Sequence, residues 1–318
     1  MFDGDLGVRF FFIISGFLIT WLLVLENDRV GRVSLKQFYI RRALRILPVY
    51  FAFILVLVGL QYFTPYSQSG QAWAGNLTFT TNFVGCYWPS AHLWTLAVEE
   101  QFYLLWPCLF VFCHMAAGGY RRASLVLVLP ILLAPVCRVI SYLHWYPAVL
   151  GPVFTPHSFL NYCDSLAMGC ASAVLLARRP GLVQWMCQTH FSRSTMVALL
   201  LILTPYVLCN LFILGIITVP LGSAMQGLGF SILLLQSVTS PERKFYRMLN
   251  WSWVRQIGIL SYSIYIWQQI FCANPETFGL GNVWWMSYPT WLLAVMVVAS
   301  LSYYGLEKPM LKLRARFR

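Results

Sequence analysis

Charged side chains are scarce in this chain, and acidic ones most of all. Charged residues make up 10% of the 318 positions, and only 10 residues are Asp or Glu. A soluble globular domain carries about 25% charged residues, so this composition excludes that class. Hydrophobic residues reach 59% instead. The balance predicts an integral membrane protein.

Metal-binding and modular features are also missing. The nine Cys are scattered, without a CxxC pair or a Cys/His ligand spacing, so we expect no metal site. Most of them lie inside apolar runs, where Cys behaves as a small apolar residue. No repeat, low-complexity tract or linker divides the chain. We therefore expect one integral membrane domain over residues 1–318.

Long apolar runs fill most of the sequence. Each has roughly 18–22 residues, about the length that a helix needs to cross 30 Å of hydrocarbon. The runs are continuously apolar, which favours helices over the alternating strands of a barrel. We predict an all-α polytopic transmembrane helix bundle with about nine spans, at residues 6–25, 44–62, 93–114, 124–142, 159–177, 194–214, 216–237, 256–274 and 288–306.

Positive charge is distributed unevenly between these runs. If the connections alternate sides, 20 of the 22 Lys and Arg fall on one side, and only Arg9 and Arg138 do not. The positive-inside rule then places the basic loops and the C-terminus in the cytoplasm and the N-terminus outside. Anionic lipid accounts for the net charge of +12, so we expect no nucleic-acid partner. A first span that enters from outside is uncommon, so we also expect a further helix upstream.

Ionisable residues inside apolar runs are costly and usually mark a site. All of those found here belong to the predicted outer half of the membrane. We expect one of two adjacent glutamates to contact an arginine or the histidine; the alternative is that the charges are ion pairs that hold helices together, above all Arg138 with Asp164. For His92 the alternative is a structural role at the membrane interface. The set is Arg9, His92, Glu99, Glu100, Arg138 and Asp164.

A second cluster opens the predicted span 44–62. Arg41 and Arg45 are four residues apart and share a helix face, and Arg42 and Arg45 share a neighbouring one. Two interpretations remain open at this point. The arginines anchor the cytoplasmic side of the helix, or their guanidinium groups bind phosphates through paired hydrogen bonds.

Six stretches of the chain resemble the membrane acyltransferase-3 family. They occur in family order across the whole sequence, which makes the resemblance highly specific. The stretches are GVRFFFIISGFLIT at 7–20, FYIRRALRILP at 38–48, HLWTLAVEEQFY at 92–103, CDSLAMG at 163–169, LSYSIYIWQQ at 260–269 and SYYGLEKP at 302–309.

The resemblance implies a bacterial inner-membrane enzyme with a ten-helix fold. Such enzymes move an acyl group, often acetyl, from acyl-CoA to a sugar hydroxyl of a cell-surface polysaccharide or a glycosylated metabolite. The implied co-substrate is acyl-CoA, with no bound cofactor. The implied catalytic residues are Glu99, Glu100, His92 and Arg9. The implied acyl-CoA-binding residues are Arg41, Arg42 and Arg45. The residues implied in acceptor binding or in structural polar contacts are Arg138, Asp164, Gln268 and Gln269.

The chain departs from the family pattern in three places. The Arg and His of the family's first helix would precede residue 1, Tyr162 stands where many relatives have Arg, and Thr95 stands where Ser is usual. A sugar hydroxyl is a weak nucleophile and needs a general base, so we expect little activity from the chain as written. An inactive fragment or a membrane scaffold is therefore the alternative function. A transporter is less favoured, because no internal repeat is seen.

Overall fold

The computed structural model describes residues 4–84, 88–115, 119–211, 213–281 and 283–317. Within these ranges the chain forms helices joined by turns and contains no strand. The prediction of an all-α fold is confirmed. The chain divides into two compact units: unit 1 is Met1–Val33 with Val98–Arg247, and unit 2 is Ser34–Ala97 with Met248–Arg318.

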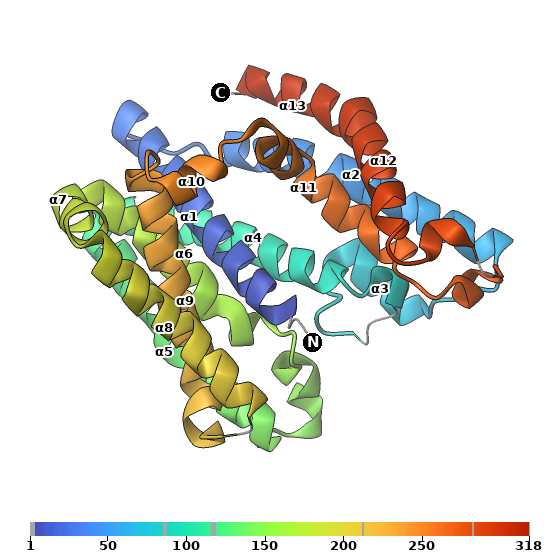
Figure 1. Cartoon of the computed structure of the whole chain (residues 1–318), viewed down its shortest axis with the longest axis horizontal. Coiled ribbons are helices and arrows are strands. Elements are labelled where there is room, and N and C mark those ends of the chain that lie inside the picture. Colours follow the sequence, from blue (N-terminus) through green and yellow to red (C-terminus); the bar gives the residue numbers. More distant parts are fainter. Residues whose placement is uncertain (1–3, 85–87, 116–118, 212, 282, 318) are drawn as a thin grey trace. The chain divides into compact units, whose positions relative to one another are not determined.

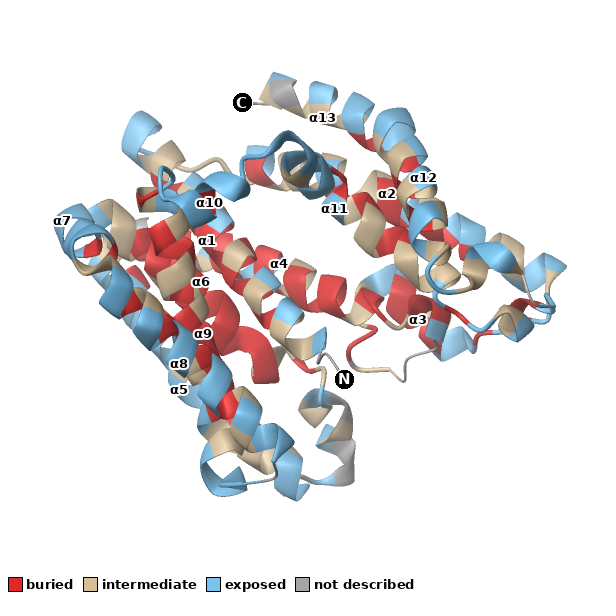
Figure 2. Cartoon of the chain, in the orientation of Figure 1, coloured by how far each residue is buried: buried red, intermediate tan, exposed pale blue. Residues whose placement is uncertain are grey.

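Unit 1 is built around helix α6, which is the most buried helix of the chain (Figure 2). Helices α1, α5 and α9 pack directly against it, and α8 packs against α9 (Figure 1). The elements of unit 1 are α1 (Gly4–Val30), α4 (Leu93–Met115) from Val98 onward, α5 (Gly119–Leu143), η2 (Ala148–Phe154), α6 (Phe159–Arg178), α7 (Pro180–Gln184), η3 (Trp185–Thr189), α8 (Phe191–Asn210), α9 (Gly215–Thr239) and α10 (Lys244–Met248).

Two glycines allow α1 and α6 to approach closely. A Cβ atom added to Gly16 would lie 2.1 Å from the carbonyl oxygen of Leu166, and one added to Gly169 would lie 2.1 Å from that of Ile13. Small residues at such contacts are the usual way in which helices pack inside a membrane, where lipid removes the hydrophobic driving force between them. The close contact fixes the polar residues of α6 beside α1.

Unit 2 is organised around α2, which packs against α11 and α13, while α12 packs against α11. Ser34 caps α2 by accepting a hydrogen bond from the backbone N–H of Gln37 at 3.4 Å. The elements of unit 2 are α2 (Leu35–Phe63), α3 (Gly70–Thr78), η1 (Trp88–Ser90), the first turn of α4, α11 (Ser252–Phe271), η4 (Pro275–Phe278), η5 (Trp284–Met286), α12 (Trp291–Ser302), η6 (Tyr303–Glu307), α13 (Lys308–Arg314) and η7 (Ala315–Phe317).

Seven helices within the described ranges are long and apolar enough to cross a membrane. They coincide with seven of the nine predicted spans, as expected for a multi-pass membrane protein. The other two predicted spans are also helical but do not meet the same test. Helix α11 carries polar residues such as Arg255 and Gln256, and α12 has only 12 residues before the π-helical turn η6 follows it.

Candidate functional site

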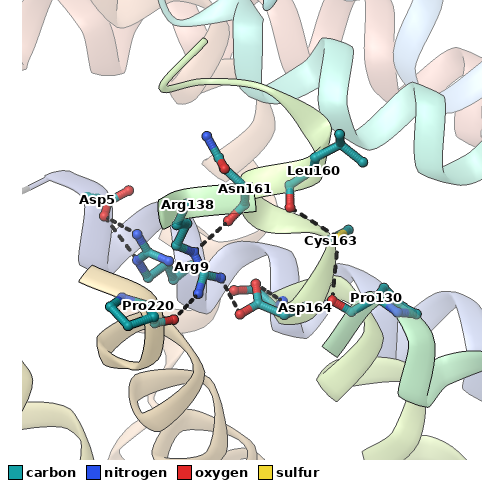
Figure 3. Close-up of polar contacts among 10 residues, drawn as sticks. Asp5, Arg9, Pro130, Arg138, Leu160, Asn161, Cys163, Asp164 and Pro220 are labelled. Carbon is teal, nitrogen blue, oxygen red and sulfur yellow. Dashed lines mark hydrogen bonds and ion pairs between the residues drawn. The ribbon is translucent and has the colours of Figure 1, made fainter. Parts of the chain in front are cut away.

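Arg138 and Asp164 form a buried ion pair between α5 and α6. All three nitrogens of the Arg138 guanidinium are used. One binds Asp164, Nε donates to the carbonyl oxygen of Asn161 at 3.2 Å, and Nη1 donates to that of Pro220 at 2.9 Å (Figure 3). Asp164 also accepts from the backbone N–H of Ser165 at 2.8 Å. The pair therefore ties α5, α6 and α9 together, in agreement with the ion-pair interpretation of these two residues.

Arg9 has a different partner, Asp5, one turn earlier on α1. Its Nε and Nη2 donate to Asp5 Oδ2 at 3.0 and 2.6 Å (Figure 3). Its guanidinium also lies over the ring of Tyr162, 5.1 Å from the centroid, and the Tyr162 hydroxyl donates to Asp5 Oδ1 at 2.8 Å. Nη1 is buried and makes no hydrogen bond within the described residues. Asp5 was missed from the sequence, although its i, i+4 spacing to Arg9 is a usable signal.

A cavity of about 540 Å³ adjoins these two ion pairs in unit 1. It lies where the N-terminal parts of α1, α6 and α9 meet the C-terminal parts of α5 and α8. Its walls combine charged groups, uncharged polar groups and aromatic rings. The lining includes the polar residues Asp5, Arg9, Arg138, Asn161, Tyr162, Ser223 and Gln226 and the aromatic residues Tyr142, Tyr146, Phe154 and Tyr206.

Glu99 lies buried on α4 among hydroxyl groups. Its Oε1 accepts hydrogen bonds from Ser15 on α1 and from Tyr103 one turn further along α4, and these two hydroxyls lie 3.0 Å apart. Glu100, the next residue, is half-buried and points about 100° around the helix. Two neutral hydroxyl donors are thus among the partners that hold Glu99.

We predicted a contact of Glu99 or Glu100 with Arg9, Arg138 or His92, and both arginines have other partners. Within the described part of the chain, the polar contacts of these arginines are with Asp5, Asp164 and two backbone carbonyls. The physical reason is proximity. Asp5 is one turn away on the same helix as Arg9, and Asp164 projects from the helix that packs against α5, so each arginine is already neutralised.

His92 belongs to unit 2, where it packs among aromatic rings. Its Nε2 lies 3.1 Å from the carbonyl oxygen of Ile266, and its ring meets those of Phe53 and Tyr265 edge to face. The Tyr265 hydroxyl donates to the His92 carbonyl oxygen at 2.7 Å. These contacts are those of a histidine that secures the start of α4 against α11. Gln268 and Gln269 are half-buried on α11, in this same unit.

The three arginines predicted to bind acyl-CoA lie on the first turns of α2 in unit 2. Arg41 donates through Nη1 to the carbonyl oxygen of Phe317 at 2.9 Å. Arg42 lies over the ring of Phe38 at 5.9 Å, and Arg45 is exposed. Helix α13, with further basic residues, packs against α2. Positive charge is therefore concentrated at this end of unit 2.

One titratable group lies outside the spans but near the cavity. His157, between η2 and α6, is half-buried, and burial lowers its pKa below the ordinary value of 6.5. The carboxylate of Asp5 acts in the opposite direction and offsets only part of this.

Among the described residues no group of three or more His, Cys, Asp or Glu is arranged to hold a metal ion.

Comparison with known families matches the chain over nearly its whole length. A family model described as an acyltransferase domain, of the acyltransferase-3 type, covers residues 2–313. This chain belongs to the acyltransferase-3 family. The membership confirms the resemblance noted in the sequence. It also gives a context to the glycine contact, because Gly16 and Gly169 lie in two of the stretches that carry that resemblance.

Relatives of this acyltransferase-3 chain include the peptidoglycan O-acetyltransferase OatA of Listeria monocytogenes, 26% identical over 97% of this chain and 51% of the relative. The putative peptidoglycan O-acetyltransferase YrhL of Bacillus subtilis is 25% identical over 96% of this chain and 50% of the relative. A putative O-acetyltransferase of Staphylococcus aureus is 37% identical over 34% of this chain and 20% of the relative. The chain thus spans about half the length of the first two. No solved structure matches it.

Proposed function

We propose that this chain is a membrane O-acyltransferase that moves an acyl group, most simply acetyl, from acyl-CoA to a sugar hydroxyl. The acceptor is part of a cell-surface polysaccharide or of a glycosylated metabolite. The observation that carries the proposal is the family match over residues 2–313, supported by relatives named as peptidoglycan O-acetyltransferases. The buried polar groups of unit 1 supply side chains suited to this chemistry.

The donor binds at the basic end of unit 2 in this proposal. Coenzyme A carries phosphates, and arginine guanidinium groups bind phosphate oxygens through paired, charge-assisted hydrogen bonds. Arg41 donates to the carbonyl oxygen of Phe317, Arg42 is half-buried over the ring of Phe38, and Arg45, one turn from Arg41 and Arg42, is exposed. Arg42 and Arg45 share a helix face by their spacing and are assigned the phosphates, and Arg41 holds the C-terminal segment beside them. The positive-inside rule places this end in the cytoplasm, where acyl-CoA is found.

Transfer requires a proton acceptor and a stabilised oxyanion. The sugar oxygen forms a bond to the thioester carbonyl carbon, the carbon–sulfur bond breaks, and the hydroxyl proton leaves through a base to the CoA thiolate. Glu99 is assigned the carboxylate that orients the base or takes the proton, because it is buried and accepts hydrogen bonds from the hydroxyls of Ser15 and Tyr103. Glu100 and His92 remain the other proton-transfer candidates, and Arg9 is the candidate for contact with the acceptor.

The test is acetyl transfer from radiolabelled acetyl-CoA to peptidoglycan or exopolysaccharide in membranes that contain the chain, both as written and with the first helix of a relative fused before residue 1; variants are compared in the more active form. Glu99→Gln keeps the size of the side chain and removes its charge, so the rate should fall by about 10²–10⁴-fold. Glu276→Gln, an exposed glutamate of η4, is the matched control and should leave the rate unchanged. Label transfer that is equally fast in Glu99→Gln would contradict the assignment of Glu99. Acceptor-independent passage of intact acetyl-CoA across the membrane would contradict the proposed function itself.

A further inference from the structure

Two residues of α9 present polar groups to the cavity and have no hydrogen-bond partner in the part of the chain that the structure describes. Ser223 and Gln226 are 7% and 8% exposed, and both line the cavity. Neither side chain makes a hydrogen bond within the described residues, and neither has its polar atoms sealed off from solvent. Buried polar groups are nearly always hydrogen-bonded, and an amide within a membrane span is costly when it is left alone. Their free groups therefore point to a ligand in the cavity.

The charges around the cavity are already balanced. Arg9 is paired with Asp5, and Arg138 is paired with Asp164. A charged ligand would add an unpaired charge to a low-dielectric site, which costs far more than adding a neutral group. What remains for recognition is the Nη1 group of Arg9, whose charge Asp5 already balances, and two uncharged groups: the Gln226 amide, which both donates and accepts, and the Ser223 hydroxyl.

The shape and the walls of the cavity agree with this. Its volume of about 540 Å³ falls inside the range of roughly 300–1,000 Å³ that is usual for small-molecule sites. Aromatic rings line it on the side of α5, η2 and α8, through Tyr142, Tyr146, Phe154 and Tyr206. Aromatic faces are suited to pack against the C–H surfaces of a ligand, and the polar groups of α9 are suited to bond its hydroxyls. A pyranose ring presents both kinds of surface.

We propose that this cavity is the acceptor subsite, that it binds an uncharged pyranose unit, and that Ser223 and Gln226 are the residues that recognise its hydroxyl groups. The inference rests on the proposed acyl transfer to a sugar. It also separates residues that contact the acceptor from residues that only position the helices around it. Arg138 and Asp164 position α5, α6 and α9 around the subsite, because their bonds are already filled by protein.

The test is calorimetric titration of the purified chain with three tetrasaccharides: the neutral chitotetraose and maltotetraose and the acidic tetragalacturonate. At least one neutral sugar should bind more tightly than the acidic one. Gln226→Leu should weaken that binding by about tenfold or more, the usual effect of losing a good hydrogen bond to a ligand. Because Gln226 bonds no other side chain or backbone group among the described residues, the variant should keep the parent's melting temperature and acetyl-CoA affinity. Gln256→Leu, which removes an exposed amide of α11 in unit 2, is the matched control and should bind as the parent does.

Two results would overturn the inference: equal affinity for the neutral sugar in Gln226→Leu and the parent, or tighter binding of tetragalacturonate. Acetyl-transfer assays separate this from the proposed function. Transfer whose acceptor KM is unchanged by Gln226→Leu would refute the subsite and leave the acyltransferase standing. Binding of a neutral sugar that depends on Gln226, without acetyl transfer by the chain either as written or with the added first helix, would refute the acyltransferase and leave the subsite standing.

Discussion

Helix α9 carries two buried glutamines in opposite states. Gln236 is fully buried, and its amide donates to the Ser194 and Thr195 hydroxyls at 2.7 and 3.1 Å, while its carbonyl oxygen accepts from the Tyr246 hydroxyl at 2.9 Å. Gln226 lies about 15 Å earlier on the same helix and has no hydrogen-bond partner among the described residues. The first amide joins three elements of unit 1, and the second faces a cavity.

The comparison separates polar groups that hold helices together from polar groups that are kept for a ligand. Inside a membrane, a side-chain hydrogen bond between helices adds stability, so a saturated group is explained by the fold alone. A buried polar group that lacks a hydrogen-bond partner is not explained by the fold, because its burial is unfavourable. The two arginines follow the same division: Arg138 uses every nitrogen on protein, whereas Arg9 leaves Nη1 without a hydrogen bond in the described residues.

The largest effect on stability should come from Arg138→Met. The change leaves the Asp164 carboxylate buried without its cation, and removal of one partner from a buried ion pair costs about 3–5 kcal/mol in the free energy of unfolding. Thermal unfolding in detergent measures it. The double variant Arg138→Met/Asp164→Leu should regain much of the loss, since no charge is then left unpaired. An unchanged melting temperature in the single variant would show that the pair does not hold α5, α6 and α9 together.

The next largest effect on stability concerns the two buried glutamines of α9. Gln236→Leu should lower the free energy of unfolding by about 1–3 kcal/mol, because Ser194 and Tyr246 lose the partner that their hydroxyls share. Gln226→Leu, the same change on the same helix, should leave stability near that of the parent. Denaturant or thermal unfolding of the two variants side by side decides the matter. A loss of stability in Gln226→Leu as large as in Gln236→Leu would erase the difference between the two ends.

Much of the fold follows from sequence pattern, because long apolar runs and their flanking charges act over short distances. The helices over seven predicted spans and the placement of Arg41, Arg42 and Arg45 on one helix required only spacing. The partners of the buried charges did not follow in the same way. Arg138 and Asp164 stand out because ionisable residues are rare in apolar runs, and the pair was correctly considered. Which partner an arginine takes depends on helix packing, and that packing is set by contacts such as Gly16 with Leu166.

Uncharged polar residues were harder still to predict. Glu99 was expected to contact an arginine or His92, whereas the structure shows two hydroxyls among its partners, and hydroxyls in an apolar run attract little notice. Ser223 and Gln226 were overlooked for the same reason. An amide inside a predicted span is nevertheless a usable signal, since it requires a partner of some kind. Only the folded chain distinguishes Gln236, whose partners are protein groups, from Gln226, which makes no hydrogen bond within the described residues.

The smallest effect concerns pH at the cavity end of unit 1. Burial holds the pKa of His157 below its ordinary value of 6.5, so the folded chain resists a protonation that the unfolded chain accepts. As pH falls through 6.5, the unfolded state binds more protons at this histidine than the folded state does, and the free energy of unfolding decreases. Well above 6.5 the histidine is neutral in both states, and its contribution to stability is complete. Melting temperatures at pH 8 and pH 5.5 should therefore differ, and the difference should narrow in His157→Gln. His190→Gln, at the end of η3, is the matched control and should keep the parent's difference. If His157→Gln shows the parent's full pH dependence, the protonation of His157 does not change the free energy of unfolding. The imidazolium would then be solvated by water at the cavity end.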